Sequence, residues 1–108
     1  MASTNWKKVE RAIAVRLNGR RQGAVGRRGP DVVTGWLSVE VKHRRRLPKW
    51  LITALEQAKS GASEQQLAIA VLHEAGQRHA DDLVLMRLAD FELWFGSVEG
   101  EVNDGTSG

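Results

Sequence analysis

Two acidic residues and one lysine near the middle of the chain have the types and spacing for metal-dependent chemistry on phosphate esters. Asp31 precedes Val32-Val33, and Glu40 and Lys42 lie two residues apart in a run of alternating apolar and polar residues. Two neighbouring carboxylates repel each other unless a positive charge lies between them. A hard divalent cation such as Mg²⁺ takes oxygen ligands, here expected from Asp31, Glu40 and the backbone carbonyl of Val41. Such an ion polarises a phosphate oxygen and activates a bound water, while Lys42 is expected to orient that water and stabilise the developing charge.

A β-hairpin would place these three side chains on one face. Glu40 and Lys42 share a face of their strand because successive side chains alternate. A two-residue Thr-Gly turn would pair Asp31 with Ser38, and cross-strand partners share a face, so we expect Asp31 diagonal to Glu40. Any turn with an even number of residues leaves Asp31 and Glu40 on the same face of the hairpin. The opposite face is then apolar and holds Val32, Leu37, Val39 and Val41.

A third carboxylate, that of Glu10, is expected to point toward the sheet. Residues 6–17 repeat apolar side chains at helical spacing, and Glu10 lies within that apolar stripe, between Trp6 and Ile13. A carboxylate directed at a core is unusual unless it is paired or bound to a metal. We therefore expect an acidic group near the metal, with a salt bridge to an arginine at the edge of the core as the alternative.

The intervening segments indicate alternating strands and helices. The Gly- and Arg-rich residues 19–29 predict a loop or a short edge strand. Pro48 is expected to open a helix that runs to about Ser60. Residues 65–73 form a continuous apolar run, which is typical of a central strand covered on both faces. Residues 81–88 supply another strand.

The C-terminal segment predicts a short helix and then a tail. Asp90 is expected to cap the helix, and Gly96 is expected to end it. The order of elements predicts an α/β fold with a mixed β-sheet flanked by helices. We expect a single small domain over residues 1–98, followed by a disordered tail at residues 99–108.

The central motif resembles that of the PD-(D/E)XK nuclease superfamily. The resemblance rests on Pro30-Asp31, on Glu40-Val41-Lys42 nine residues after the aspartate, and on Glu10 in a preceding helix. It spans about residues 6–96, and within the superfamily the chain looks most like the archaeal-type Holliday junction resolvases, including phage-borne ones. The resemblance implies a restriction-endonuclease-like fold and Mg²⁺ as cofactor, with Mn²⁺ able to substitute. It also implies a homodimer that makes paired symmetric cuts in four-way DNA junctions.

The same resemblance implies roles for individual residues. Asp31 and Glu40 would bind the metal, Lys42 would be the catalytic lysine, and Glu10 would be an auxiliary acidic group near the metal. Gln57, on the following helix, resembles an auxiliary glutamine of some branches. Three alternatives remain open at this point: a nuclease acting on flaps, nicks or duplex DNA, a non-catalytic DNA-binding module of the same fold, and a ladder of surface salt bridges on a sheet.

The charge distribution favours a nucleic-acid partner. Residues 1–59 contain 14 Lys and Arg and four Asp and Glu. Residues 60–108 contain two Lys and Arg and nine Asp and Glu. Such asymmetry predicts a basic face for a polyanion, although a solvated charged surface is the plainer interpretation. The basic residues expected to contact DNA phosphates on either side of the motif are Arg20, Arg21, Arg27, Arg28, His43, Arg44, Arg45 and Arg46.

Other features exclude or disfavour whole classes of function. The chain contains no Cys, which excludes disulfides, thiolate metal sites and cysteine nucleophiles. No apolar run approaches the ~20 residues of a membrane span, so we expect a cytoplasmic protein, or one in the host cytoplasm if a phage encodes it. His43, His73 and His79 match no standard zinc-ligand spacing. Phe91, Trp94 and Phe95 are expected at a dimer contact.

Overall fold

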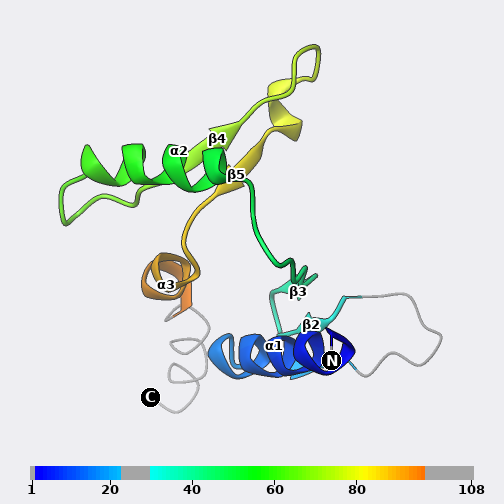
Figure 1. Cartoon of the computed structure of the whole chain (residues 1–108). Helices are drawn as coiled ribbons and strands as arrows, with labels where there is room; N and C mark the ends of the chain where they lie inside the picture. The colour runs from blue at the N-terminus through cyan, green and yellow to red at the C-terminus, as the bar shows by residue number, and fades with distance from the viewer. Residues whose placement is uncertain (1, 23–29, 97–108) are drawn as a thin grey trace, which may run out of the picture. The chain divides into compact units, whose positions relative to one another are not determined.

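The computed structural model describes residues 2–22 and 30–96, and the chain divides into two compact units. The described residues of the first unit are 2–22 and 30–45, and those of the second are 46–96. The described part of the first unit contains α1 (Ala2–Arg16), β1 (Arg20–Arg21), β2 (Val32–Val33) and β3 (Ser38–Val39) (Figure 1). The second contains α2 (Lys49–Ser60), β4 (Ala70–Leu72), β5 (Leu83–Leu85) and α3 (Leu88–Phe91), with a 3-10 turn at His79–Asp81 and a π-helical turn at Glu92–Gly96. The protein is therefore mixed α/β.

Helix α1 ends where the chain turns back to form the first strand. Asn18 adopts a left-handed conformation with φ of 55°, and the Gly19 N–H donates to the Ala14 carbonyl at 2.8 Å, which closes the last turn. The predicted helix over residues 6–17 is confirmed for nearly all of its length. In Figure 1, α1 lies alongside β2, and Ala14 and Val32 are both buried.

The first unit contains a three-stranded antiparallel sheet in the order β1-β2-β3. In β2 and β3, Val32 pairs with Val39 and Val33 pairs with Ser38. This register differs by two residues from the predicted one, because Thr34 organises a four-residue connection. Its side-chain oxygen accepts hydrogen bonds from the backbone N–H groups of Trp36 and Leu37 at 3.2 and 3.0 Å.

The shift of two residues keeps every side chain on its predicted face. Val32 is fully buried and shares its face with Val39, as expected. Asp31 and Glu40 lie just outside this ladder, where the Asp31 N–H donates to the Val39 carbonyl, so the diagonal relationship of Asp31 and Glu40 stays a prediction. The short edge strand expected within residues 19–29 is β1, while residues 23–29 lie outside the described part of the chain.

The second unit is built on the β4–β5 hairpin, against which α2 packs (Figure 1). Helix α2 starts after Pro48 and ends at Ser60, as predicted, and it buries Leu55. The prediction of a central strand at residues 65–73 was wrong. Only three of those residues form β4, Val71 is exposed, and the described residues pair β4 with β5 alone.

The last helix also differs from its prediction. Helix α3 begins at Leu88 after Arg87, so Asp90 lies inside its first turn and does not cap it. The helix continues into a π-helical turn that ends at Gly96. The predicted domain boundary at residue 98 and the tail at residues 99–108 lie outside the described residues.

The described strands form two small antiparallel sheets, so the single mixed sheet is not confirmed, and the restriction-endonuclease-like arrangement stays a prediction. Strands of two or three residues offer few backbone groups for wider pairing. Across the described segments, no helix has the length and apolar character needed to cross a membrane.

Candidate functional site

The predicted catalytic residues line one hollow of about 350 Å³ in the first unit. Helix α1 contributes Glu10, the residue before β2 contributes Asp31, and the segment after β3 contributes Glu40 and Lys42. The remaining lining residues are Trp6, Val41, His43 and Arg44. Side chains far apart in the sequence thus meet at one surface, as the hairpin argument predicted.

Backbone and side-chain hydrogen bonds hold Asp31 against the neighbouring strand. The Asp31 N–H donates to the Val39 carbonyl at 2.8 Å. In return, its Oδ2 accepts a hydrogen bond from the Val41 N–H at 2.7 Å. One carboxylate oxygen is therefore engaged by the segment that carries Glu40 and Lys42, and the carboxylate is fixed at the rim of the hollow.

Glu40 and Lys42 form an ion pair on the same face. The Lys42 Nζ lies 3.1 Å from the Glu40 Oε2, and both side chains are more than half exposed. An exposed pair of this kind adds about 0 to 1 kcal/mol to stability. The pair therefore contributes little to folding.

Glu10 is buried and paired with an arginine. Its side chain is 5% exposed, and the Arg21 Nε donates to its Oε1 at 2.8 Å. The alternative weighed for Glu10, a salt bridge to an arginine at the core edge, is thus present in the structure. Arg21 was predicted to contact DNA, but its side chain is only 24% exposed and is directed at Glu10.

The donor set suits a hard divalent cation. Asp31 and Glu40 both line the hollow, and Mg²⁺ commonly uses one or two protein carboxylates while keeping several waters. Glu10 pairs with Arg21 and Glu40 pairs with Lys42, and within the described part of the chain the three carboxylates of the hollow do not form a three-ligand cluster. The arrangement fits Mg²⁺ held by Asp31 and Glu40, with Glu10 nearby.

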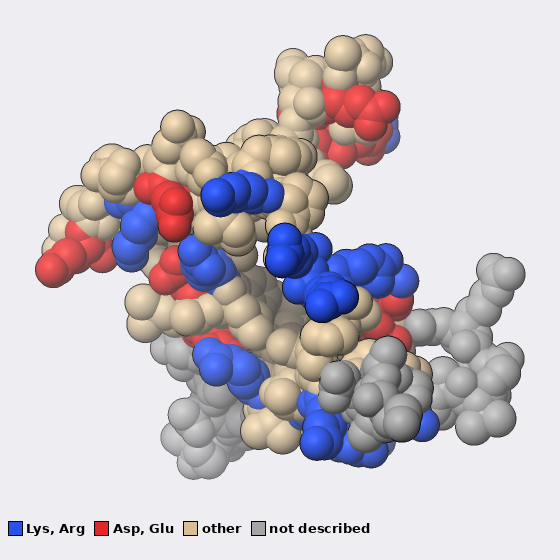
Figure 2. Space-filling view, in the orientation of Figure 1, with Lys and Arg blue, Asp and Glu red and all other residues tan. Residues whose placement is uncertain are grey.

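The other residues predicted to bind DNA fall into three groups. His43 and Arg44 line the hollow, and Arg20, Arg45 and Arg46 are exposed. Figure 2 shows Lys and Arg side chains gathered on the visible face of the unit that carries α1 and β3. Arg27 and Arg28 lie outside the described residues.

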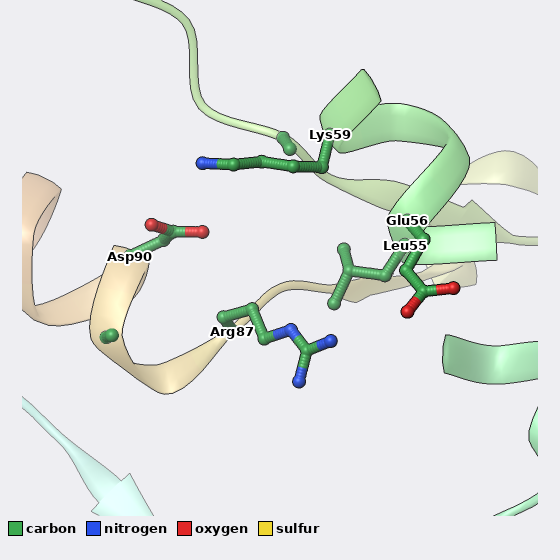
Figure 3. Close-up of a pocket in the computed structure, with 7 residues that line it drawn as sticks. Leu55, Glu56, Lys59, Arg87 and Asp90 are labelled. Atoms are coloured by element: carbon green, nitrogen blue, oxygen red, sulfur yellow. The ribbon is translucent and has the colours of Figure 1, made fainter. Parts of the chain in front are cut away.

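The second unit has its own cavity of about 270 Å³, between α2 and α3. Leu55 and two alanines form its apolar part, and Lys59 and Asp90 reach toward each other at its edge (Figure 3). None of the predicted catalytic residues lines it. Gln57 is exposed on α2, in the second unit.

One group of possible ligands was missed by the sequence reasoning. His73, His79 and Asp82 come together at the far end of the β4–β5 hairpin. The correct cross-strand register would have revealed this group. A hairpin that pairs Leu72 with Leu83 brings the next residues, His73 and Asp82, opposite each other. Standard zinc-ligand spacings do not include such pairs.

Comparison with known proteins returns no match to a family model, to a curated protein or to a solved structure. A fold class alone does not specify an activity. A function for this chain is therefore argued from the residues of the site and from the motif that they form.

Proposed function

We propose that this protein is a Mg²⁺-dependent DNA endonuclease of the PD-(D/E)XK type. The observation that carries the proposal is the meeting of Asp31, Glu40 and Lys42 at one hollow on one face of a hairpin. The motif that suggested this chemistry in the sequence thus corresponds to a compact arrangement of side chains. A restriction-endonuclease-like fold is part of the same proposal.

The carboxylates would bind the metal, and the lysine would orient water and stabilise charge. Asp31 and Glu40, with the Val41 carbonyl, would hold Mg²⁺, and Glu10, paired with Arg21, would be the auxiliary acidic group near them. When bound, Mg²⁺ polarises the scissile phosphate and lowers the pKa of a water ligand. The Lys42 ammonium, kept at the hollow by Glu40, donates hydrogen bonds to the attacking water and to the charge that develops on the phosphate.

The neighbouring cations favour a nucleic-acid substrate. His43 and Arg44 line the hollow beside the carboxylates, and exposed Arg45 and Arg46 continue the basic run. Contacts from such residues to phosphates provide affinity without sequence information. They would hold the DNA backbone while the carboxylates and the metal act on one phosphodiester.

We further propose that the substrate is branched DNA, namely the four-way junction, and that the active form is a homodimer. A four-way junction has near two-fold symmetry, so a C2 dimer can present two equivalent sites to matched strands. The exposed apolar side chains of Leu93 and Trp94 in the second unit support a subunit contact. Analytical ultracentrifugation of the full chain, compared with Trp94→Ser, tests the dimer separately.

Cleavage of a panel of labelled DNAs tests the activity and its selectivity together. The purified chain is incubated with a four-way junction, a flap, a nicked duplex and a linear duplex, each with Mg²⁺, with Mn²⁺ and with a chelator. Paired symmetric nicks in the junction alone, abolished by the chelator, are the expected result. Equal cutting of linear duplex would reject junction selectivity, and binding without cleavage under either metal would reject the nuclease in favour of a non-catalytic module.

A further inference from the structure

The tip of the β4–β5 hairpin holds two histidines and an aspartate in direct contact. The His73 Nδ1 lies 2.6 Å from one carboxylate oxygen of Asp82, and the His79 Nδ1 lies 3.1 Å from the other. The two imidazole rings are tilted by 37°, with centroids 4.6 Å apart. One potential ligand atom from each residue lies within 4.8 Å of the others.

Local structure explains why these side chains converge. The pairing of Leu72 with Leu83 places His73 opposite Asp82 at the next step of the hairpin. The 3-10 turn at His79–Asp81 then folds the chain so that His79 approaches Asp82. The Asp82 N–H donates to the His79 carbonyl at 3.0 Å. Gly76, with φ of 86°, adopts a left-handed conformation that suits the connection.

The electrostatics of the tip favour a cation. Each carboxylate oxygen of Asp82 contacts one imidazole nitrogen, so this acidic side chain lies between the two possible nitrogen ligands. The Asp82 side chain is 11% exposed, whereas the two imidazoles are accessible to solvent. Figure 2 shows acidic side chains gathered at this tip, where Asp81 is paired with Arg78 and Asp82 contacts the two histidines.

We propose that His73, His79 and Asp82 form a binding site for a divalent transition-metal ion such as Zn²⁺. Two imidazole nitrogens and one carboxylate oxygen are ordinary zinc ligands, and three protein ligands leave one position for water. Zinc–ligand distances of about 2.0–2.2 Å in tetrahedral geometry place the donor atoms roughly 3.4 Å apart. The donors here lie within 4.8 Å of one another, so small rotations, which exposed His79 permits, would bring them to those positions.

This site differs from the proposed Mg²⁺ site in both chemistry and location. Imidazole nitrogens favour Zn²⁺ and similar ions, whereas the oxygen donors of Asp31 and Glu40 favour Mg²⁺. All three ligands lie in the second unit, and the proposed catalytic residues lie in the first. An ion at the tip would cross-link the ends of β4 and β5 and stabilise the hairpin.

The chain contains only three histidines, so the imidazole resonances of the full-length protein provide a direct assay. In a Zn²⁺ titration followed by ¹H–¹⁵N NMR, the side-chain signals of His73 and His79 are expected to shift together and saturate at one equivalent. The His43 signal serves as an internal control and should stay unchanged. If His73 and His79 do not move at stoichiometric Zn²⁺, the tip is only a hydrogen-bonded hairpin end and the proposal is wrong.

Variants separate this site from the proposed catalytic one. Asp82→Asn, which preserves size, should weaken Zn²⁺ binding by about 10- to 100-fold, while His43→Ala should leave it unchanged. Amide spectra of each variant report whether the fold is retained. Asp31→Asn should keep the Zn²⁺-induced shifts even though we expect it to lose cleavage. A shift of the His43 signal alone, lost in Asp31→Asn, would assign the ion to the first unit and overturn the proposal.

Discussion

The Asp31 carboxylate accepts a hydrogen bond from the Val41 N–H at 2.7 Å, which ties the residue before β2 to the segment after β3. Val41 lies between Glu40 and Lys42 in the sequence. This hydrogen bond therefore holds the Asp31 carboxylate near the backbone that carries Glu40 and Lys42. The bond needs an acceptor oxygen at position 31 but no negative charge. Hydrogen bonding and metal binding by Asp31 can therefore be separated by substitution.

Arg21→Ala should destabilise the first unit. The substitution leaves the Glu10 carboxylate, 5% exposed, without the guanidinium that compensates it. Removal of one partner of a buried ion pair costs about 3 kcal/mol or more in the free energy of unfolding. Urea denaturation measures the change. The matched control is Arg20→Ala on the exposed face of β1, for which we expect less than about 0.5 kcal/mol.

The double variant Glu10→Gln with Arg21→Ala tests the cause of that loss. Neutralising Glu10 removes the uncompensated charge, so the double variant should be more stable than Arg21→Ala alone. Equal stability of the two variants would mean that Arg21 stabilises the unit by packing and not by pairing with Glu10.

Gly19→Ala should also destabilise the first unit, because the added methyl group has no space. A Cβ at this position would lie 2.8 Å from both the Thr34 Cγ2 and the Val33 carbonyl oxygen. Overpacking of this kind costs about 1–3 kcal/mol. In Gly61→Ala the nearest atom to the new Cβ is 4.0 Å away, so this control should change stability little. Equal losses in the two variants, measured by thermal unfolding, would contradict the close approach at Gly19.

Lys42→Met should remove cleavage without loss of stability. The Lys42–Glu40 pair is exposed, so its contribution to folding is about 1 kcal/mol at most. Loss of one hydrogen-bond donor to the developing charge lowers the rate by about 10²- to 10³-fold. Single-turnover cleavage of a labelled junction, together with thermal unfolding, gives both quantities. Lys49→Met, at the start of α2, is the control that should retain full activity.

The exposed arginines after the motif should contribute salt-dependent affinity. Replacing Arg44, Arg45 and Arg46 with alanine should weaken binding to junction and linear duplex alike. The logarithm of the association constant falls linearly with the logarithm of the salt concentration. The slope of this line should become shallower by about 0.9 for each phosphate that the variant no longer neutralises. Fluorescence anisotropy over a range of salt concentrations measures the slope. Arg78→Ala, which removes an exposed ion pair of the second unit, should leave it unchanged.

The sequence predicted which side chains come together at the hollow better than it predicted the details of the fold. Alternation along a strand predicted one face for Asp31, Glu40 and Lys42, and all three line one hollow although they lie outside the two short strands. The register itself depended on hydrogen bonds to the Thr34 side chain, which a two-residue turn does not include. The burial of Glu10 was expected from helical spacing, but its partner Arg21 lies eleven residues away on another element.

The second unit was harder to predict for a related reason. An apolar run at residues 65–73 is compatible with a covered strand, yet its pairing partner is decided by tertiary contacts that periodicity does not encode. The pairing of β4 with β5 then brought His73 and Asp82 together, which ligand-spacing rules could not detect. Asp90 is a favoured capping residue type, but Arg87 precedes the helix and Asp90 falls within it.

The most direct measurement of the central claim is single-turnover cleavage of a four-way junction by Asp31→Asn in the presence of Mg²⁺. Asparagine can still accept the Val41 N–H, so the variant should fold and bind the junction as the unchanged chain does. Loss of the ligand charge should lower the cleavage rate by at least about 100-fold, whereas Asp81→Asn, the same change in the second unit, should have no effect. Undiminished cleavage by Asp31→Asn would contradict the assignment of this site.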